Sequence, residues 1–337
     1  MQQVPSEFEV AEGAMPTLRD VIAARPRVYR YLKPTPLYHY AGLSELIGAK
    51  VWVKHENHQP VGAFKVRGGL NLVAQLSEKE RASGLFTAST GNHGQSIAYA
   101  ARALGVRATI AVPEGANPSK VASMRGLGAE VAFHGHDFDS AREWVMGIAA
   151  AQGGRFVGPT EEQLIHGVGT YALEIVEDLP EVDTIIVPVG AGSGVCATGI
   201  VAKTIDPGIQ VIGVQSAQAP AIQMSWASGK AVSADMRTVA EGLATRVPFE
   251  NTQRIMRKYL DDFVLVEDAA IEEAILLLLE HTHNLAEGAG AAALAAAIKL
   301  KPRLAGKNVV LVLSGGNLSV DQLRQLLARS GSSARAS

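Results

Sequence analysis

Short apolar runs alternate with longer segments of helical periodicity along most of the chain. The apolar runs predict strands at 50–53, 85–89, 108–112, 130–133, 184–189, 210–214, 263–266 and 309–313. The segments between them predict helices at 17–24, 26–32, 64–80, 92–104, 118–127, 140–151, 161–178, 195–204, 269–284, 289–300 and 320–328. Pro26 is expected to separate the first two helices, because proline lacks the N–H that a helix interior uses.

Repeated strand–helix units with continuously apolar strands are typical of parallel sheets covered by helices on both faces. The units are too many for one sheet, so we predict an α/β protein with two parallel-rich sheets. The predicted domains are a discontinuous large domain, 1–83 plus 161–337, and a small inserted α/β domain at 84–160. Residues 1–14 are expected to be a tail, and the polar end at 330–337 is expected to fray.

Composition and charge narrow the class of protein. The chain has 337 residues, 47% of them hydrophobic and 19% charged, and its formal net charge of −2 offers no basic footprint for nucleic acid. Cys196 is the single cysteine, so neither a disulfide framework nor a cysteine zinc cluster is expected. The apolar stretches 275–279 and 291–298 are too short to span a membrane, and residues 1–12 do not resemble a signal peptide. A cytoplasmic soluble protein with no membrane or nucleic-acid partner is the expectation.

One lysine stands in unusual surroundings, within Pro60-Val61-Gly62-Ala63-Phe64-Lys65-Val66-Arg67-Gly68-Gly69. Most lysines are solvated surface charges, and a lysine at the start of a helix is the simpler interpretation. The apolar and small neighbours of Lys65 favour a partly desolvated amine. Desolvation lowers the pKa of a lysine and makes its amine a nucleophile.

Three loops follow predicted strands, where ligands bind in such folds. Ser89-Thr90-Gly91-Asn92-His93-Gly94 opens a helix and could hold a substrate carboxylate, or could simply be an Asn-capped helix start. Gly190-Ala191-Gly192-Ser193-Gly194 could bind phosphate. Its G-x-G-x-x-A spacing also fits a dinucleotide, but the next strand ends without the acid that a ribose needs, which favours a monophosphate. Leu313-Ser314-Gly315-Gly316-Asn317 offers a hydroxyl beside a close-approach turn.

Together these segments supply an amine nucleophile, a carboxylate loop, a phosphate loop and a lone hydroxyl. Pyridoxal 5'-phosphate needs a Schiff-base lysine, a phosphate cup and a partner for its ring nitrogen. The four segments therefore predict a pyridoxal-phosphate enzyme.

From about residue 17 to residue 328 the chain resembles the serine/threonine dehydratase and serine racemase branch of the fold type II pyridoxal-phosphate enzymes, which have the tryptophan synthase β-like architecture. V-G-A-F-K-V-R-G-G, S-T-G-N-H-G-Q, V-P-V-G-A-G-S-G and L-S-G-G-N occur in the order and spacing of that family.

The resemblance implies a role for each motif residue. Lys65 would form the Schiff base with the cofactor and act as the base, Phe64 would pack by the ring, and Asn92 would bond the phenolic oxygen. Ser89, Thr90, Gly91, Asn92 and His93 would line the carboxylate pocket, with Ser89 and Thr90 counted among the catalytic residues. Gly190, Ala191, Gly192, Ser193 and Gly194 would bind the phosphate, and Ser314 the pyridine nitrogen. Gly242 and Glu287 belong to segments that would flank the cofactor.

The activity implied is β-elimination from a β-hydroxy-α-amino acid, giving a 2-keto acid and ammonia. Threonine or serine is the expected substrate. A bulkier one such as phenylserine stays open, because Ala63 replaces the usual serine and could enlarge the pocket. An amino-acid racemase is the alternative, and Thr90 keeps the hydroxyl that racemases use there. A ligand sensor that retains the fold is a third interpretation, which the complete set of catalytic residues disfavours.

Further departures from the family pattern change the expected site. Residues 214–220 carry no acid, so no divalent metal site is expected there. The chain ends near residue 337, which is expected to leave no room for a C-terminal regulatory domain. Family analogy suggests a homodimer or homotetramer.

Overall fold

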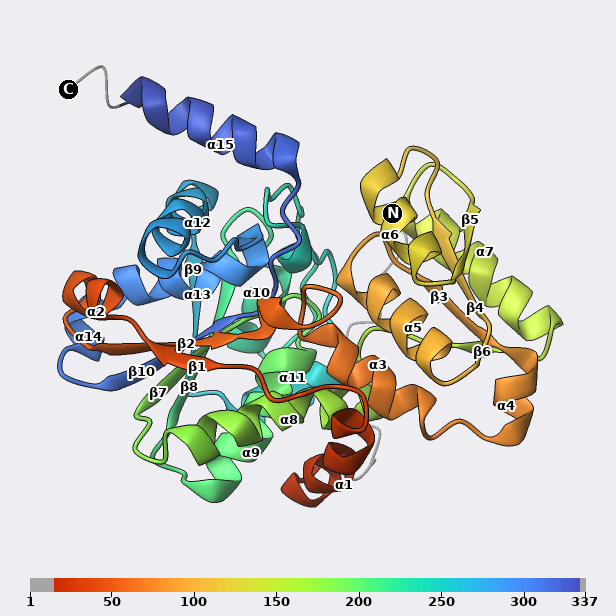
Figure 1. Ribbon diagram of the computed structural model, residues 1–337, viewed down its shortest axis with the longest axis horizontal. Coiled ribbons are helices and arrows are strands. Elements are labelled where there is room, and N and C mark those ends of the chain that lie inside the picture. Colours follow the sequence, from red (N-terminus) through yellow and green to blue (C-terminus); the bar gives the residue numbers. More distant parts are fainter. Residues whose placement is uncertain (1–14, 334–337) are drawn as a thin grey trace.

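The computed structural model describes residues 15–333, and their strands form two sheets in two lobes (Figure 1). The strands are β1 Leu37–His39, β2 Lys50–His55, β3 Leu85–Ala88, β4 Ala108–Val112, β5 Glu130–Phe133, β6 Arg155–Phe156, β7 Thr184–Pro188, β8 Gln210–Ser216, β9 Asp262–Val266 and β10 Asn308–Leu313.

The helices cover these sheets and connect their strands. They are α1 Leu18–Tyr29, α2 Ala41–Ile47, α3 Lys65–Val73, α4 Glu78–Ser83, α5 Asn92–Ala103, α6 Pro118–Gly126, α7 Phe138–Ala151, α8 Glu162–Asp178, α9 Ser193–Ile205, α10 Ala221–Ser228, α11 Glu250–Tyr259, α12 Asp268–Thr282, α13 Gly288–Lys299, α14 Lys301–Leu304 and α15 Val320–Ser333, with 3-10 turns η1 Glu56–His58 and η2 Glu241–Leu243.

The larger sheet has six strands in the order β1-β2-β10-β7-β8-β9. All neighbouring strands are parallel except β1, which pairs antiparallel with β2 at one edge. Helix α13 covers one face and α8 and α9 lie on the other (Figure 1). Because β2, β10 and β7 are adjacent and parallel, the loops at their carboxyl ends meet at one edge of the sheet.

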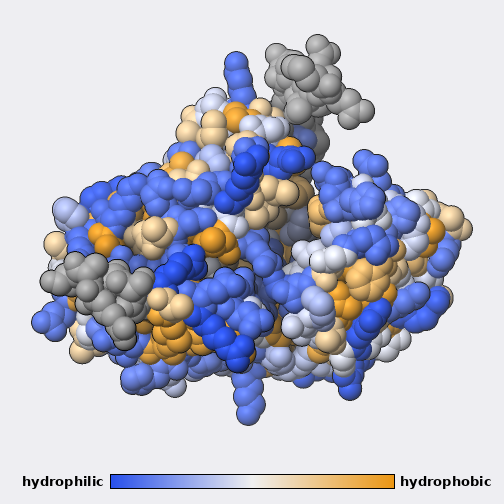
Figure 2. Space-filling view, turned by 90° about the horizontal axis from the view of Figure 1, so that it is seen from above, coloured by the Kyte–Doolittle hydropathy of each residue, from blue (hydrophilic) through white to orange (hydrophobic). Residues whose placement is uncertain are grey.

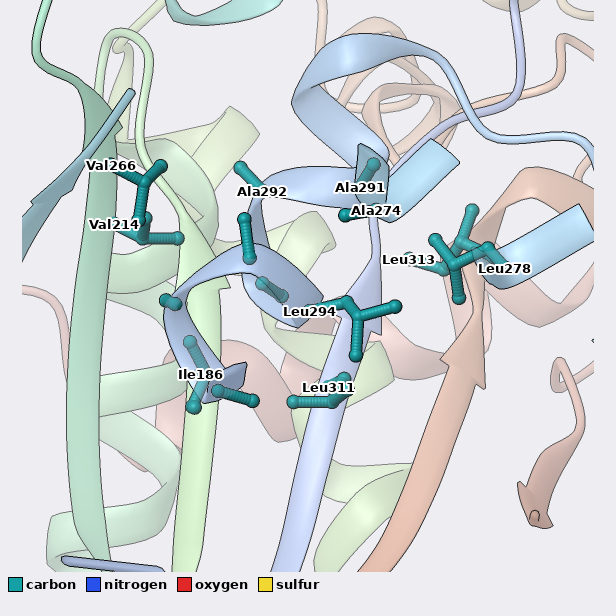
Figure 3. Close-up of a cluster of buried hydrophobic side chains, with 14 of the residues drawn as sticks. Ile186, Val214, Val266, Ala274, Leu278, Ala291, Ala292, Leu294, Leu311 and Leu313 are labelled. Atoms are coloured by element: carbon teal, nitrogen blue, oxygen red, sulfur yellow. The ribbon is translucent and has the colours of Figure 1, made fainter. Parts of the chain in front are cut away.

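Alternate residues of β10 enter two different cores. Val309, Leu311 and Leu313 pack with α12 and α13, whereas Val310 and Val312 pack with α8 and α9. Figure 3 shows the first core, in which Leu294 of α13 lies against Leu311. A strand buried on both faces must be apolar at every position, which explains the continuous apolar run.

The smaller sheet has four parallel strands in the order β5-β4-β3-β6 and lies in the second lobe (Figure 1). Helices α5 and α6 cover one face and α7 covers the other, each with its own apolar cluster. The two sheets confirm the predicted fold class. The proposed boundaries of an inserted domain at 84–160 stay a prediction.

Two helix predictions were wrong. Helix α1 continues through Pro26, because Val21, Ala24 and Val28 bury one apolar face that holds the helix despite the missing N–H. The single helix expected at 64–80 is two helices, α3 and α4. Ser77 is the N-cap of α4: its hydroxyl accepts from the Glu80 backbone N–H while the Glu80 side chain accepts from the Ser77 N–H.

Other elements were absent from the predictions or differ in length. Strand β1 and helices α2, α10 and α11 were not predicted, and α15 continues to Ser333 where fraying was expected from residue 330. The predicted tail at 1–14 lies outside the described residues. Within the described part of the chain, no helix has both the length and the apolar character needed to cross a bilayer.

Candidate active site

The lysine loop and the loop after β10 are joined by backbone contacts. Ala63 and Gly315 form an isolated antiparallel bridge, and the Phe64 N–H donates to the Ser314 carbonyl at 3.1 Å. Ser314 is 5% exposed, so its side chain lies in the interior close to the start of α3. The structure therefore brings together two of the predicted segments that are 250 residues apart.

Lys65 faces the glycine-rich loop. Its Nζ donates to the Ser193 Oγ at 2.8 Å and lies 5.1 Å from the centre of the Phe64 ring. Burial lowers the pKa of Lys65 to about 8, because a desolvated ammonium loses its hydration. The neutral amine is therefore more populated near neutral pH than it is for an exposed lysine, although the ammonium is still the major form.

The two glycines after the lysine have another role than the one inferred from the sequence. A Cβ on Gly68 would lie 2.8 Å from the Leu164 carbonyl of α8, and one on Gly69 would lie 2.4 Å from the Ser96 Oγ of α5. These glycines let α3 pack closely against α8 and α5.

The loop between β7 and α9 packs tightly against neighbouring segments. A Cβ on Gly190 would lie 2.2 Å from the Gly242 carbonyl. Gly192 has φ +103° and is the N-cap residue of α9, a conformation that favours glycine. The Thr252 hydroxyl donates to the Ala191 carbonyl at 2.9 Å and fixes the loop. Free N–H groups at the start of α9 suit a phosphate.

Gly194 lies where this loop meets the lysine. A Cβ there would contact the Phe64 ring and the Tyr171 hydroxyl, each at 3.4 Å. The Tyr171 hydroxyl donates to the Gly194 carbonyl at 3.0 Å, and the Tyr171 and Phe64 rings meet edge to face. Cys196 is buried, as expected for a small apolar side chain.

The loop after β3 is shaped by a serine. The Ser89 Oγ accepts hydrogen bonds from the N–H groups of Gly91 at 3.2 Å and Gly94 at 2.9 Å. Thr90 is half-buried, and no atom lies within 4 Å of the position of a Cβ on Gly91. The start of α5 thus opens onto free space, as an anion site requires.

His93 is held as a neutral ring. Burial lowers the pKa of His93 to about 4, and the nearby charge of Lys65 acts in the same direction. Its Nε2 lies 3.1 Å from the Thr87 Oγ1. The His93 ring is therefore uncharged at pH 7, and its contact with Thr87 of β3 connects the start of α5 to this strand.

Asn92 is bound from two sides by residues of the other lobe. Its Nδ2 donates to the Glu287 Oε1 at 2.7 Å, and its Oδ1 accepts from the Asn317 Nδ2 at 2.8 Å. Burial raises the pKa of Glu287 to about 7. Sequence reasoning proposed Asn92 and Glu287 separately, missed their contact and assigned no role to Asn317. The position of Asn317 directly after two glycines at a strand end was the available signal.

The segments around Glu287 pack closely at glycine and alanine residues. A Cβ on Gly242 would lie 2.8 Å from the Ala289 side chain, and one on Gly288 would lie 2.9 Å from Ala240. A cavity of about 270 Å³ lies beside Glu287, with Lys120 of α6 on its wall. Lys120 forms an ion pair with Glu241, which links the two lobes at this point.

A buried network of charged side chains around Arg67 was also not predicted from the sequence. Arg67 of α3 is fully buried and binds Glu56 at 2.7 Å and Glu174 of α8 at 2.6 Å. The ammonium of Lys54 is 2.6 Å from Glu174 and donates to the Thr35 carbonyl at 2.7 Å. Two cations and two carboxylates thus balance, and they tie α3 to β2 and α8.

Within the described residues, no group of three or more His, Cys, Asp or Glu side chains could hold a metal ion.

The residues present fit a phosphorylated aldehyde. Lys65 supplies a desolvated amine, and the Gly190–Gly194 loop leads into the start of α9, whose first N–H groups are available to an anion. Asn92, Glu287 and Ser314 surround the same region from three loops. The arrangement can form a carbon–nitrogen bond to an aldehyde and hold a phosphate and a carboxylate on two helix N-termini.

Comparison with known proteins gives consistent results. The model of the family described as pyridoxal-phosphate dependent enzyme matches residues 28–315. The chain is 39% identical over 315 residues to L-threonine ammonia-lyase of Thermotoga maritima, covering 93% of this chain and 78% of that protein. It is 34% identical to the catabolic L-threonine dehydratase TdcB of Escherichia coli K12, covering 91% and 94%. Maize serine racemase superposes with a TM-score of 0.89 at 28% identity, covering 96% of this chain and all of that one.

Proposed function

The chain belongs to the pyridoxal-phosphate dependent enzymes, and from this premise we propose that it dehydrates and deaminates threonine or serine to a 2-keto acid and ammonia. The family and the threonine ammonia-lyase relatives establish a pyridoxal-phosphate dependent ammonia-lyase of the threonine and serine type. Pyridoxal 5'-phosphate is its cofactor, as the sequence predicted. The observation that carries the proposal is the Lys65 amine, desolvated and 2.8 Å from Ser193 in the glycine loop.

Lys65 would hold the cofactor, and its Nζ would accept the proton from the substrate Cα. When bound, pyridoxal phosphate supplies an electron sink for the carbanion left at Cα. The lowered pKa of Lys65 makes its amine available as a base at neutral pH. The Gly190–Gly194 loop and the start of α9 would bind the phosphate, and Ser314 would face the ring nitrogen.

The loop from Ser89 to His93 would bind the substrate carboxylate. Its anion site faces free space at Gly91, and the positive end of the α5 dipole favours a negative charge there. Because Ser89 already accepts from two backbone N–H groups, its remaining capacity is to donate its hydroxyl proton. Thr90 carries the other hydroxyl of this loop.

The packing of Ala63 favours a small substrate. Ala63 is fully buried and its Cβ would lie 3.3 Å from a Cβ on Gly315. Its small side chain is therefore used for contact with the loop after β10. It opens no added room for a phenyl group, so we propose threonine and serine ahead of phenylserine.

Racemisation is the second candidate, favoured by the likeness to maize serine racemase and by the hydroxyl of Thr90. Racemisation needs a proton donor on the face opposite Lys65. Elimination instead needs the β-hydroxyl to take up a proton and leave as water, with no donor required at Cα. The methyl group that distinguishes threonine from serine restricts Thr90 to fewer rotamers, which favours elimination.

The deciding experiment incubates the holoenzyme with L-threonine, L-serine and L-phenylserine and measures 2-keto acid, ammonia and D-amino acid. We expect keto acid from threonine and serine, with little D-serine. D-serine in excess of pyruvate would make the protein a racemase. The Lys65→Ala variant should lack the near-visible absorbance of the cofactor–lysine linkage and should be inactive. Turnover by that variant would refute the proposal.

A further inference from the structure

We infer that Asn317 is a positioning residue that fixes the orientation of the Asn92 side-chain amide in the active site. This inference rests on the proposed function, because the purpose of the orientation is to present an N–H of Asn92 to the cofactor. Among the described residues, Asn317 forms no hydrogen bond with Lys65 or with the Gly190–Gly194 loop. It acts through Asn92.

The orientation of Asn317 is set by a backbone carbonyl. Its Nδ2 donates to the Val61 carbonyl oxygen at 2.9 Å, in the loop that carries Lys65. A carbonyl oxygen can only accept, so the amide nitrogen of Asn317 must face Val61. Gly62 makes this approach possible: it has φ +67°, and a Cβ there would lie 2.6 Å from the Asn317 Oδ1.

The orientation of Asn92 then follows. The same Asn317 Nδ2 donates its second hydrogen to the Asn92 Oδ1 at 2.8 Å. Because Asn317 offers a donor, Asn92 must present its oxygen to Asn317 and its nitrogen to the other side. There the Asn92 Nδ2 donates one hydrogen to the Glu287 Oε1 at 2.7 Å. One N–H of Asn92 is left for a ligand.

This chain of contacts joins three segments that meet only through folding. Val61 lies four residues before Lys65, Asn317 follows β10, and Asn92 begins α5 in the other lobe. An amide that turned over would present its oxygen where an N–H is needed, and the phenolic oxygen of the cofactor would meet an acceptor. Asn317 thus couples the lysine loop to the donor that the ligand meets.

The test compares Asn317→Ala and Asn317→Asp with the parent enzyme. Alanine leaves Asn92 held only by Glu287. Aspartate offers acceptors alone, so it attracts the Asn92 Nδ2 and turns the amide over. We expect the dissociation constant for pyridoxal phosphate to rise about tenfold in Asn317→Ala and further in Asn317→Asp. The near-visible absorbance maximum should shift, and kcat should fall about 10- to 100-fold with a smaller change in KM.

Controls separate positioning from stability. Asn284 is a half-buried amide that binds Asn57 at 3.1 Å and His58 at 2.7 Å, and among the described residues it forms no hydrogen bond with Asn92. The Asn284→Ala variant should unfold at a similar temperature to Asn317→Ala and bind the cofactor like the parent. In the Asn92→Ala background, Asn317→Ala should add less than twofold to the loss of affinity.

The outcomes are distinguishable. If the parent enzyme does not take up the cofactor, the proposed function fails. If the parent does, and both Asn317 variants keep its affinity and spectrum, this inference alone is wrong. Full additivity with Asn92→Ala would also overturn it, since Asn317 would then act by another route. Should Asn317→Ala fail to fold, Asn317→Ser and Asn317→Asp carry the same comparison.

Discussion

The Lys65 amine lies 2.8 Å from the Ser193 hydroxyl oxygen, a residue 128 positions further along the chain. The contact places the Lys65 amine next to the glycine-rich loop Gly190–Gly194. The sequence identifies the lysine segment and this loop independently of each other. A cofactor held by its aldehyde at Lys65 and by its phosphate at the loop would span this contact.

Ser193→Ala should therefore weaken binding of pyridoxal phosphate about tenfold, because one hydrogen bond to a charged group is lost. Equilibrium titration of the cofactor-free protein, followed by absorbance, measures the change. Ser225→Ala is the matched control, because Ser225 is also a buried serine but bonds the Ala221 carbonyl in α10. An unchanged affinity in Ser193→Ala would remove the serine from the phosphate site.

The lowered pKa of Lys65 predicts how cofactor uptake depends on pH. Only the neutral amine attacks the aldehyde, and burial brings the pKa down from 10.5 to about 8. The rate of uptake by the cofactor-free protein should rise with pH and level off above pH 8 to 9. Nα-acetyl-lysine, measured in parallel, corrects for titration of the cofactor itself and should keep rising to above pH 10. Identical profiles for the protein and the model compound would contradict a desolvated lysine.

The lowered pKa of Lys65 also predicts how the stability of the protein changes with pH. The amine is protonated in both states below pH 8, and only in the unfolded chain between about pH 8 and 10.5. The contribution of Lys65 to the free energy of unfolding of the cofactor-free protein therefore increases over that window. The Lys65→Met variant should lose this increase.

The buried network around Arg67 predicts a large effect on stability. Removing Arg67 leaves the carboxylates of Glu56 and Glu174 buried with Lys54 as the remaining cation. Breaking a buried ion pair on one side costs about 3–5 kcal/mol. Arg67→Ala should lower the free energy of unfolding in urea by that amount.

An exposed pair provides the control for Arg67. Arg25 binds Glu177 with two hydrogen bonds of 2.6 Å, but both side chains are more than a third exposed. Arg25→Ala should cost less than about 1 kcal/mol. Equal losses for the two arginines would mean that the network around Arg67 contributes no more than a surface pair.

Most of the fold was predictable because its strands are buried on both faces. Continuous apolar runs such as 309–313 indicate central parallel strands when they are short and rich in β-branched residues. Strand β1 was missed because it is an exposed antiparallel edge of three residues. Helices α3 and α4 were merged because no glycine or proline separates them, although the capping pair of Ser77 and Glu80 was readable.

The site was predictable where chemistry follows strand ends and unpredictable where side chains meet across lobes. Lys65 and the loops after β7 and β10 follow neighbouring parallel strands, so topology alone brings them to one edge of the larger sheet, whereas the Ser89 loop follows β3 of the smaller sheet. Glu287 and Asn317 bind Asn92 from 195 and 225 residues away. No local pattern specifies such contacts, since they depend on how α5 is seated against α13 and the loop after β10. The buried ion pairs of Arg67 could not be predicted from the sequence for the same reason.

Glu287 predicts a pH-dependent stability with the opposite sign to that of Lys65. Its carboxyl has a pKa of about 7 in the folded protein against an ordinary value of 4.5, so the folded state binds the extra proton between these values. The stability that this group contributes is fully present below about pH 4.5 and is lost as the pH rises through 7. Glu287→Gln keeps an oxygen to accept from the Asn92 amide and cannot ionise.

The free energy of unfolding of cofactor-free Glu287→Gln should therefore gain on the parent protein as the pH rises from 5 to 8, by an amount of the order of 1–3 kcal/mol. Leu326→Ala is the control, because Leu326 is a buried residue on the wall of the same cavity without a titratable group. Its loss, about 2–5 kcal/mol for a buried leucine, should be the same at each pH. Parallel curves for the parent and Glu287→Gln would mean that Glu287 is ionised throughout, and its contact with Asn92 would then be that of a full carboxylate.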